Sequence, residues 1–111
     1  MDRLSHAVKY ARQRLIADPD RTACVYVIKC DKFYKIGVAD NVKVRLAALQ
    51  HCNPIELRVV AARRVAKAFS VESKLHIKYK PFHVRGEWFE LTEHALHELI
   101  LLLRGEPVPK D

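Results

Sequence analysis

The chain has 111 residues, with 20 Lys and Arg against 13 Asp and Glu, a formal net charge of +7 and a pI near 9.5. This length fits about one domain, since domains usually have roughly 100–200 residues. A hydrophobic fraction of 50% is enough to form a core. The positive charge suits a polyanionic partner better than a cationic one, and a basic surface without a partner is the alternative.

The cysteines and the apolar runs indicate the compartment. Cys24, Cys30 and Cys52 are an odd number and include no CxxC pair, so a reducing cytoplasm is expected and a disulfide framework is not. The apolar run 95–103 contains polar residues and is far shorter than the roughly 20 residues that span a bilayer. The N-terminus has no apolar stretch of the signal-peptide kind. The sequence predicts a soluble protein without a membrane partner.

The N-terminal third predicts a helix followed by a β-hairpin. Residues 4–17 have apolar side chains at helical spacing among basic ones, which predicts an amphipathic helix with a basic face. The β-branched and aromatic runs 23–28 and 33–38 flank a short polar turn, which is typical of an antiparallel hairpin. We expect Gly37 to end the second strand.

A helix and a long strand are expected next. Asp40 or Asn41 provides an N-cap for this helix, which should end before Pro54. The run 55–65 predicts a third, basic strand. The buried stripe of the helix is predicted at Val42, Leu46 and Leu49.

The C-terminal half predicts two helices with a strand between them. Residues 66–80 have a helical pattern that ends at Pro81. Residues 87–91 predict a short strand, and Thr92 is a suitable N-cap for a strongly apolar helix over 93–103. The predicted order is α-β-β-α-β-α-β-α, without an internal repeat or a long linker.

The candidate residues for chemistry are those that a nuclease needs: a carboxylate for a divalent cation, a group that activates water, and positive charge near the phosphate. Glu72 lies within the 66–80 helix, and His76 follows at i+4 on the same face. Arg45 borders the inner face of its helix. The alternatives are a solvated glutamate, a structural histidine and a snorkelling arginine.

The strand tyrosines Tyr26 and Tyr34 are further candidates, although rings in strands more often simply pack. Gly37 is expected to be required by backbone geometry. Other site types are disfavoured, because the sequence has no CxxC or HxxxH pair, no GxSxG elbow and only three glycines.

Five segments together carry a family resemblance. They are "CVYVI" (24–28), "YKIG" (34–37), Arg45 eight residues after the motif glycine, Glu72 in "VESKLH", and "VRGEWFEL" (84–91). In this order and spacing they resemble the GIY-YIG nuclease superfamily, specifically a phage and bacterial branch with KIG in its second motif and a closing RGEWF signature. The resemblance covers roughly residues 23–91.

The resemblance implies an α+β fold with a small three-stranded antiparallel central sheet flanked by helices. The implied domain spans 23–91. A basic N-terminal helix within 1–22, and a C-terminal helix and tail at 92–111, would be added to it. The implied location is the cytoplasm of a bacterial or phage-infected cell.

The implied activity is DNA phosphodiester hydrolysis by a metal-dependent endonuclease. Glu72 would hold Mg²⁺ or Mn²⁺, Tyr26 would activate the attacking water, and Arg45 would stabilise charge on the phosphate. Lys35 occupies the second tyrosine position as a proton-handling group or a phosphate contact, and His76 is a hypothesis from helix spacing alone. The implied substrate-binding residues are Tyr34, Gly37, Arg63, Arg64 and Arg85.

The motifs also depart from the family pattern. Cys24 and Val25 replace the leading glycine and isoleucine of the first motif, Lys35 replaces a tyrosine, and Arg85 and Glu87 stand near the position of a closing asparagine. A catalytically degenerate DNA-binding or regulatory module is therefore the alternative function.

A second alternative is an oligomer, formed through apolar residues of the 93–103 helix. The preferred interpretation is that this helix closes the domain's own core. So small a domain leaves little surface for sequence recognition, which favours weak specificity or a protein partner that supplies it. The residues in question are Leu96, Leu99, Ile100 and Leu103.

Overall fold

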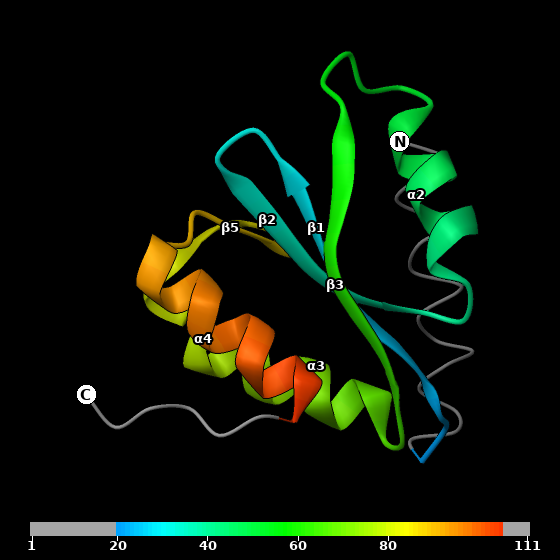
Figure 1. Cartoon of the computed structure of the whole chain (residues 1–111), viewed down its shortest axis with the longest axis vertical. Helices are drawn as coiled ribbons and strands as arrows, with labels where there is room; N and C mark the ends of the chain where they lie inside the picture. Colours follow the sequence, from blue (N-terminus) through cyan, green and yellow to red (C-terminus); the bar gives the residue numbers. More distant parts are fainter. Residues whose placement is uncertain (1–19, 106–111) are drawn as a thin grey trace.

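The computed structural model describes residues 20–105 (Figure 1). The predicted basic helix 4–17 lies outside the described residues. Within them, the order of secondary-structure elements after the N-terminal segment agrees with the sequence prediction, except for one additional strand and a short 3₁₀ helix. The elements are β1 (Ala23–Cys30), β2 (Phe33–Ala39), α2 (Val42–Gln50), β3 (Leu57–Val65), α3 (Ala68–Lys78), the 3₁₀ helix η1 (Lys80–Phe82), β4 (His83–Arg85), β5 (Trp88–Phe89) and α4 (Glu93–Arg104).

The strands form one five-stranded sheet in the order β3-β1-β2-β5-β4, and every paired neighbour is antiparallel. The predicted three-stranded central sheet is therefore wrong, although the α+β class stands. Strand β4 was not predicted, and β5 is shorter than the strand predicted over residues 87–91. These two strands have only three and two residues, and all of β4 is exposed, so neither carries the alternating pattern that identifies a strand.

The β1–β2 hairpin forms the centre of the sheet, and Asp31 takes a left-handed conformation at its turn. Its register places Tyr26 opposite Gly37. The prediction that Gly37 ends the second strand is wrong, because β2 continues to Ala39. Gly37 is thus an interior residue of β2, and the ring of Tyr26 packs against it.

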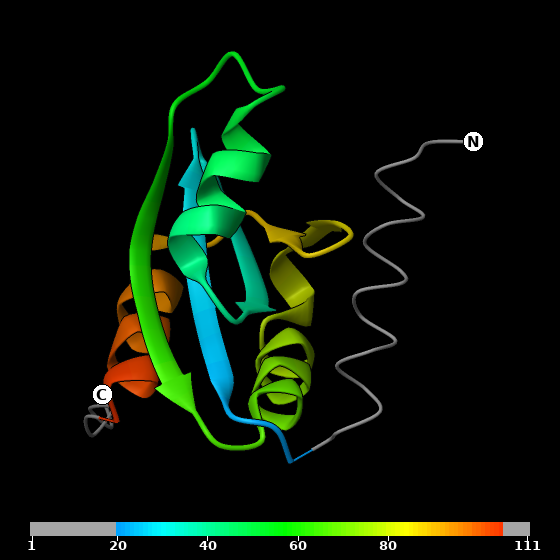
Figure 2. The same ribbon diagram turned by 90° about the vertical axis from the view of Figure 1, so that its right-hand side faces the viewer.

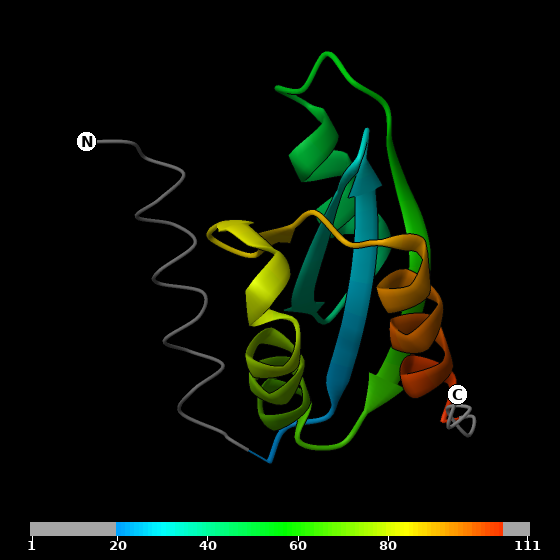
Figure 3. The same cartoon turned by 90° about the vertical axis from the view of Figure 1, so that its left-hand side faces the viewer.

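Helices cover both faces of the sheet (Figures 2 and 3). Helices α3 and α4 pack on one face, where alternate residues of the hairpin form the larger core cluster. Helix α2 covers part of the other face, over a smaller cluster that includes Tyr26 and Ile28. Strand residues two apart share a face, so Phe33, Lys35 and Gly37 lie on the same side of β2, the side that α2 covers.

The N-termini of α2 and α4 agree with the sequence, whereas α3 is shorter than the predicted helix 66–80 and spans Ala68–Lys78. Asn41 caps α2 by accepting a hydrogen bond from the Val44 N–H at 3.1 Å, and Thr92 caps α4 by accepting one from the Ala95 N–H at 3.1 Å. Helix α4 buries Leu99 and Leu103 in the larger core cluster. Within residues 20–105, none of the helices combines the length and apolar character that a membrane crossing requires.

Candidate metal and phosphate site at the edge of β2

The site lies where the pairing of β2 with β5 ends, while β1 still pairs with β2 on the other side. Strand β5 pairs with β2 only at Tyr34 and Lys35, so the peptide groups of Ile36 bind other segments. The Ile36 N–H donates to the Glu87 carbonyl at 3.0 Å, and the Ile36 carbonyl lies 2.8 Å from His76 Nε2. One edge residue therefore fixes both the β4–β5 turn and helix α3 against β2. Figure 2 shows α3 and this turn beside the strand.

Three side chains converge at this edge. Glu72, His76 and Glu87 each offer a ligand atom, and the three atoms lie within 4.8 Å of one another. Glu72 and His76 come from successive turns of α3, and Glu87 comes from the β4–β5 turn. The Glu72 residue is only 2% exposed, whereas glutamates are rarely fully buried without partners. The alternative of a solvated glutamate is thus excluded, and two carboxylates with one imidazole form a suitable ligand set for a divalent cation.

The hydrogen bond of His76 fixes which ring nitrogen is available. A carbonyl oxygen only accepts, so Nε2 must carry the proton that is donated to the Ile36 carbonyl. In the neutral ring Nδ1 then has the free lone pair. A backbone partner of this kind orients a histidine for metal binding or proton transfer.

Tyr26 crosses β2 directly above Gly37. A Cβ atom placed on Gly37 would lie 2.5 Å from the Tyr26 Oη and 2.6 Å from its Cζ. Gly37 does not have a positive φ; the positive-φ glycines of the described residues are Gly86 and Gly105. The expectation that backbone geometry requires this glycine is therefore wrong. The glycine is needed because the tyrosine ring occupies the space of a side chain.

Arg45 completes this part of the site from α2. Its Nη1 donates to the Tyr26 Oη across a long contact of 3.5 Å. Its side chain is half-buried at the border of the inner face, as its position beside Leu46 predicted. The hairpin, α2, α3 and the β4–β5 turn thus each contribute a polar group around the Tyr26 hydroxyl.

The charges of the cluster affect the pKa of the Tyr26 hydroxyl. The pKa of the hydroxyl is raised to about 12, mainly by burial and also by the negative charges of Glu87 and Glu72, while Arg45 acts in the opposite direction. The hydroxyl is therefore protonated at neutral pH and is available as a hydrogen-bond donor. Both carboxylates thus act on the Tyr26 hydroxyl through their negative charge.

Lys35 links this cluster to the next strand. Its Nζ lies 3.4 Å from Glu87 Oε1, in a pair whose side chains are 12% and 17% exposed, and 5.6 Å from the centre of the Trp88 ring. An ion pair this well shielded from water is stronger than a surface pair. Lys35 therefore holds positive charge beside the carboxylates rather than extending into solvent.

The remaining sequence-predicted residues lie elsewhere. Tyr34 is 8% exposed and belongs to the core cluster on the opposite face of the sheet. Arg63 and Arg64 are on β3, the far edge strand, and the Arg63 Nη1 donates to the Leu103 carbonyl at 3.1 Å. Arg85 is exposed at the end of β4, near the site but outside the carboxylate cluster. The structure thus brings together Tyr26, Lys35, Gly37, Arg45, Glu72 and His76.

Glu87 is the residue that sequence reasoning did not assign to the site. It lies in the segment "VRGEWFEL" (84–91), near the position where the family pattern has a closing asparagine that this sequence lacks. Its position depends on Gly86, whose φ of 54° forms the β4–β5 turn. A glycine directly before an acidic residue was the available signal, but it gives no indication that this turn meets α3.

Comparison with known families identifies the chain. The model of the T5orf172 domain matches residues 23–104, from the start of β1 to the end of α4. The chain belongs to the T5orf172 domain family, which is associated with nuclease-like and DNA-binding functions. No curated protein and no solved structure matches the chain.

This finding corrects the family assignment made from the motifs. The assignment to the GIY-YIG superfamily is wrong, because the matching model is that of the T5orf172 domain and no GIY-YIG model matches. Short motifs such as "YKIG" and "CVYVI" carry little information individually.

Proposed function

We propose that this protein is a divalent-metal-dependent DNA endonuclease that hydrolyses phosphodiester bonds at the edge of β2. The observation that carries the proposal is the convergence of Glu72, His76 and Glu87 within 4.8 Å, next to the cationic side chains of Arg45 and Lys35. Anionic ligands for a cation beside groups that bind phosphate are the combination such a reaction needs. The net charge of +7 is consistent with a polyanionic substrate.

Glu72 and Glu87 would hold Mg²⁺ or Mn²⁺, because hard divalent cations prefer carboxylate oxygens. When bound, the cation supplies positive charge that polarises the phosphoryl group. The buried position of Glu72 on α3 and the ion pair of Glu87 with Lys35 hold both carboxylates in place before a substrate arrives. This rigidity keeps the reorganisation needed for binding small.

Three residues would bind and orient the phosphodiester. Arg45 lies next to the Tyr26 hydroxyl and provides a guanidinium, whose planar donors match phosphate oxygens. Tyr26 is protonated at neutral pH, so its hydroxyl donates a hydrogen bond to the phosphate or to the attacking water. Lys35 provides a second positive charge near the carboxylates.

We assign proton acceptance to His76 rather than to Tyr26. The Nε2 proton of His76 is donated to the Ile36 carbonyl, which leaves Nδ1 with a lone pair that can accept a proton from water. Tyr26, with a pKa of about 12, is a poor base near neutral pH. Its contribution is therefore orientation and hydrogen bonding in this proposal.

The test is cleavage of end-labelled duplex, branched and single-stranded DNA with Mg²⁺ or Mn²⁺, beside EDTA. The informative variant is Glu72→Gln, which preserves the size of the side chain and removes its charge. Glu56→Gln is the matched control, because Glu56 is exposed and forms a surface ion pair with Arg58, two residues along. Binding of Mn²⁺ is measured separately by calorimetry, so that metal affinity does not depend on observing turnover.

We expect cleavage that EDTA and Glu72→Gln abolish and that Glu56→Gln leaves unchanged. Binding of Mn²⁺ should weaken in Glu72→Gln and in Glu87→Gln. If no substrate is cut, and DNA binding is salt-sensitive but unaffected by metal or by Glu72→Gln, the protein is a DNA-binding module that has lost the reaction. That result would overturn the proposed activity.

A further inference from the structure

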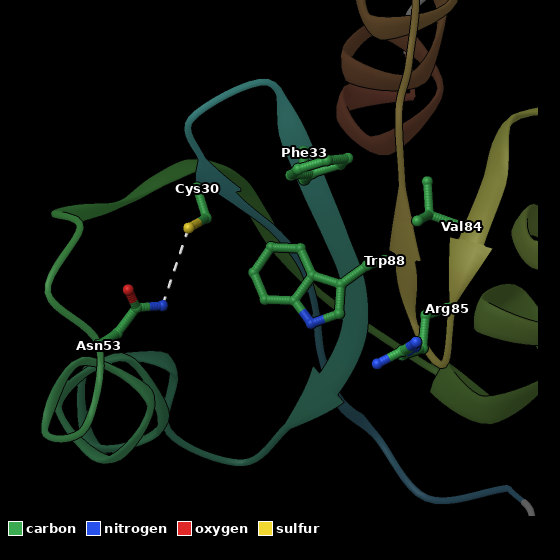
Figure 4. Close-up of a pocket in the computed structure, with 6 residues that line it drawn as sticks. All are labelled: Cys30, Phe33, Asn53, Val84, Arg85 and Trp88. Atoms are coloured by element: carbon green, nitrogen blue, oxygen red, sulfur yellow. Dashed lines mark hydrogen bonds between the residues drawn. The ribbon is translucent and has the colours of Figure 1, made fainter.

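The second distinctive feature of this surface is a pocket of about 420 Å³ formed by β1, β2, β4, β5 and the loop after α2. Its volume is in the range of small-ligand sites, about 300–1,000 Å³. Figure 4 shows Trp88 at its centre, with Phe33 and Arg85 on two sides and Asn53 opposite. The residues that line it are Cys30, Phe33, Asn53, Val84, Arg85 and Trp88.

The lining combines aromatic rings with hydrogen-bonding groups. Trp88 and Phe33 are only partly buried, and Val84 is 51% exposed, so flat apolar surface faces solvent. The Asn53 Oδ1 accepts from the Ile55 N–H at 2.9 Å, and its Nδ2 has only a weak contact of 3.7 Å with the Cys30 Sγ. The amide is therefore held in place while its Nδ2 retains a donor for a ligand.

The position of the pocket connects it with the candidate nuclease site. Trp88 directly follows Glu87 and is the cross-strand partner of Lys35. The Nζ of Lys35 contacts both the Glu87 carboxylate and the Trp88 ring. Phe33, Lys35 and Gly37 lie on one face of β2, and each step of two residues covers about 7 Å. A ligand in the pocket would thus lie about one nucleotide from a phosphate bound at the carboxylates.

We infer that this pocket binds an unpaired nucleobase of the DNA strand whose phosphodiester lies at the Glu72–Glu87 cluster. The inference rests on the proposed function and extends it to the substrate class. A nucleobase has a π-face for Trp88 and Phe33 and polar edges for Asn53, and Arg85 provides charge for the adjoining backbone. A base within a duplex is stacked and paired, so the pocket favours single-stranded, flapped or otherwise opened DNA.

The chain provides its own reporter, because Trp88 is its only tryptophan. The full-length protein in EDTA, which prevents cleavage, is titrated with a single-stranded oligothymidylate while tryptophan fluorescence is followed. An oligonucleotide of equal length made of abasic units has the same phosphates without bases. A blunt duplex presents bases that are already paired. We expect saturable quenching by the oligothymidylate, with affinity about tenfold or more above that for the abasic strand and the duplex.

Variants of the lining residues distinguish a loss of base stacking from a loss of the folded structure. Phe33→Leu keeps an apolar side chain and should remove most of the preference for the base-containing strand. Phe82→Leu is the control, because this ring packs against Tyr79 at 6.5 Å outside the pocket. Circular dichroism verifies that both variants fold. If Phe33→Leu is unfolded, Phe33→Met replaces it, because its flexible apolar side chain fills a similar space without offering a ring face. It should likewise remove most of the preference for the oligothymidylate over the abasic strand.

The outcomes distinguish this inference from the proposed activity. If the protein binds the abasic and thymidylate strands with equal affinity, the pocket does not bind a base, even if the protein cleaves DNA. The same conclusion follows if the strand binds without a change in fluorescence. Quenching that persists in Glu72→Gln, combined with base preference, would support the pocket even if no cleavage is found.

Discussion

The ring of Tyr26 occupies the space that a side chain on Gly37 would need. A Cβ atom at that position would lie 2.5 Å from the Tyr26 Oη. The two residues are cross-strand partners in the hairpin, so the hydroxyl reaches past β2 towards α3 and the β4–β5 turn. Gly37 thus sets the position of the hydroxyl that Arg45, Glu72 and Glu87 surround.

Gly37→Ala should therefore displace the Tyr26 ring and lower the free energy of unfolding by about 1–3 kcal/mol, as overpacking does. In a Tyr26→Ala background the same substitution should have a much smaller effect, because the clash is gone. Urea unfolding of the four proteins of this double-mutant cycle measures the coupling. Additive effects would contradict the contact as the reason for the glycine.

The raised pKa of the Tyr26 hydroxyl predicts how the free energy of unfolding depends on pH in the alkaline range. Its pKa in the folded protein is about 12, whereas a tyrosine in an unfolded chain has a pKa of about 10. A raised folded pKa contributes stability that is complete below about pH 10 and is lost as pH rises towards about 12. The pKa of Tyr79 is raised as well, by burial and by its hydrogen bond to Glu98.

Stability should therefore fall steeply over this interval, and Tyr26→Phe should reduce the slope by up to about 1.4 kcal/mol per pH unit. Urea unfolding between about pH 9 and about pH 11.5 measures both slopes. Equal slopes for the two proteins would show that Tyr26 ionises as easily in the folded state as in the unfolded chain.

His76 gives a prediction for the rate of cleavage. If its Nδ1 accepts the proton of the attacking water, His76→Gln should slow cleavage by about 10²–10⁴-fold, because a glutamine amide is not a base. The exposed His97, changed to Gln, is the control. Calorimetry with Mn²⁺ shows whether His76→Gln also weakens metal binding; a loss of metal affinity that accounts for the whole loss of rate would indicate that His76 acts as a ligand instead.

Substitutions in helix α4 distinguish a helix that serves only the core of one chain from a helix that also forms an interface between chains. Leu99 is fully buried, whereas the neighbouring Leu102 is 38% exposed. Leu99→Ala should lower the free energy of unfolding by about 2–5 kcal/mol, and Leu102→Ala should change it by about 0.5 kcal/mol or less. Light scattering of the wild-type protein and of Leu102→Ala measures association. A wild-type oligomer that Leu102→Ala dissociates would indicate that α4 forms an interface.

The sequence by itself determined the local structure. The hairpin, the N-caps at Asn41 and Thr92, and the helices on either side of β3 follow from patterns within a few residues. Glu72 and Arg45 could be selected because a buried stripe predicts which helix face turns inward. These signals are local, since caps, turns and periodicity depend on residues that are neighbours in the chain.

Only the tertiary structure decided how distant segments meet. The β4–β5 turn brings Glu87 to Glu72 and His76, fifteen and eleven residues earlier in the chain, because the N–H of Ile36 binds the turn and the carbonyl of Ile36 binds α3. Gly37 is required by a ring from the neighbouring strand, and Trp88 joins Phe33 in a pocket through strand pairing. These contacts depend on sheet order and register, which arise from packing of the whole chain and leave no periodic pattern in any one segment.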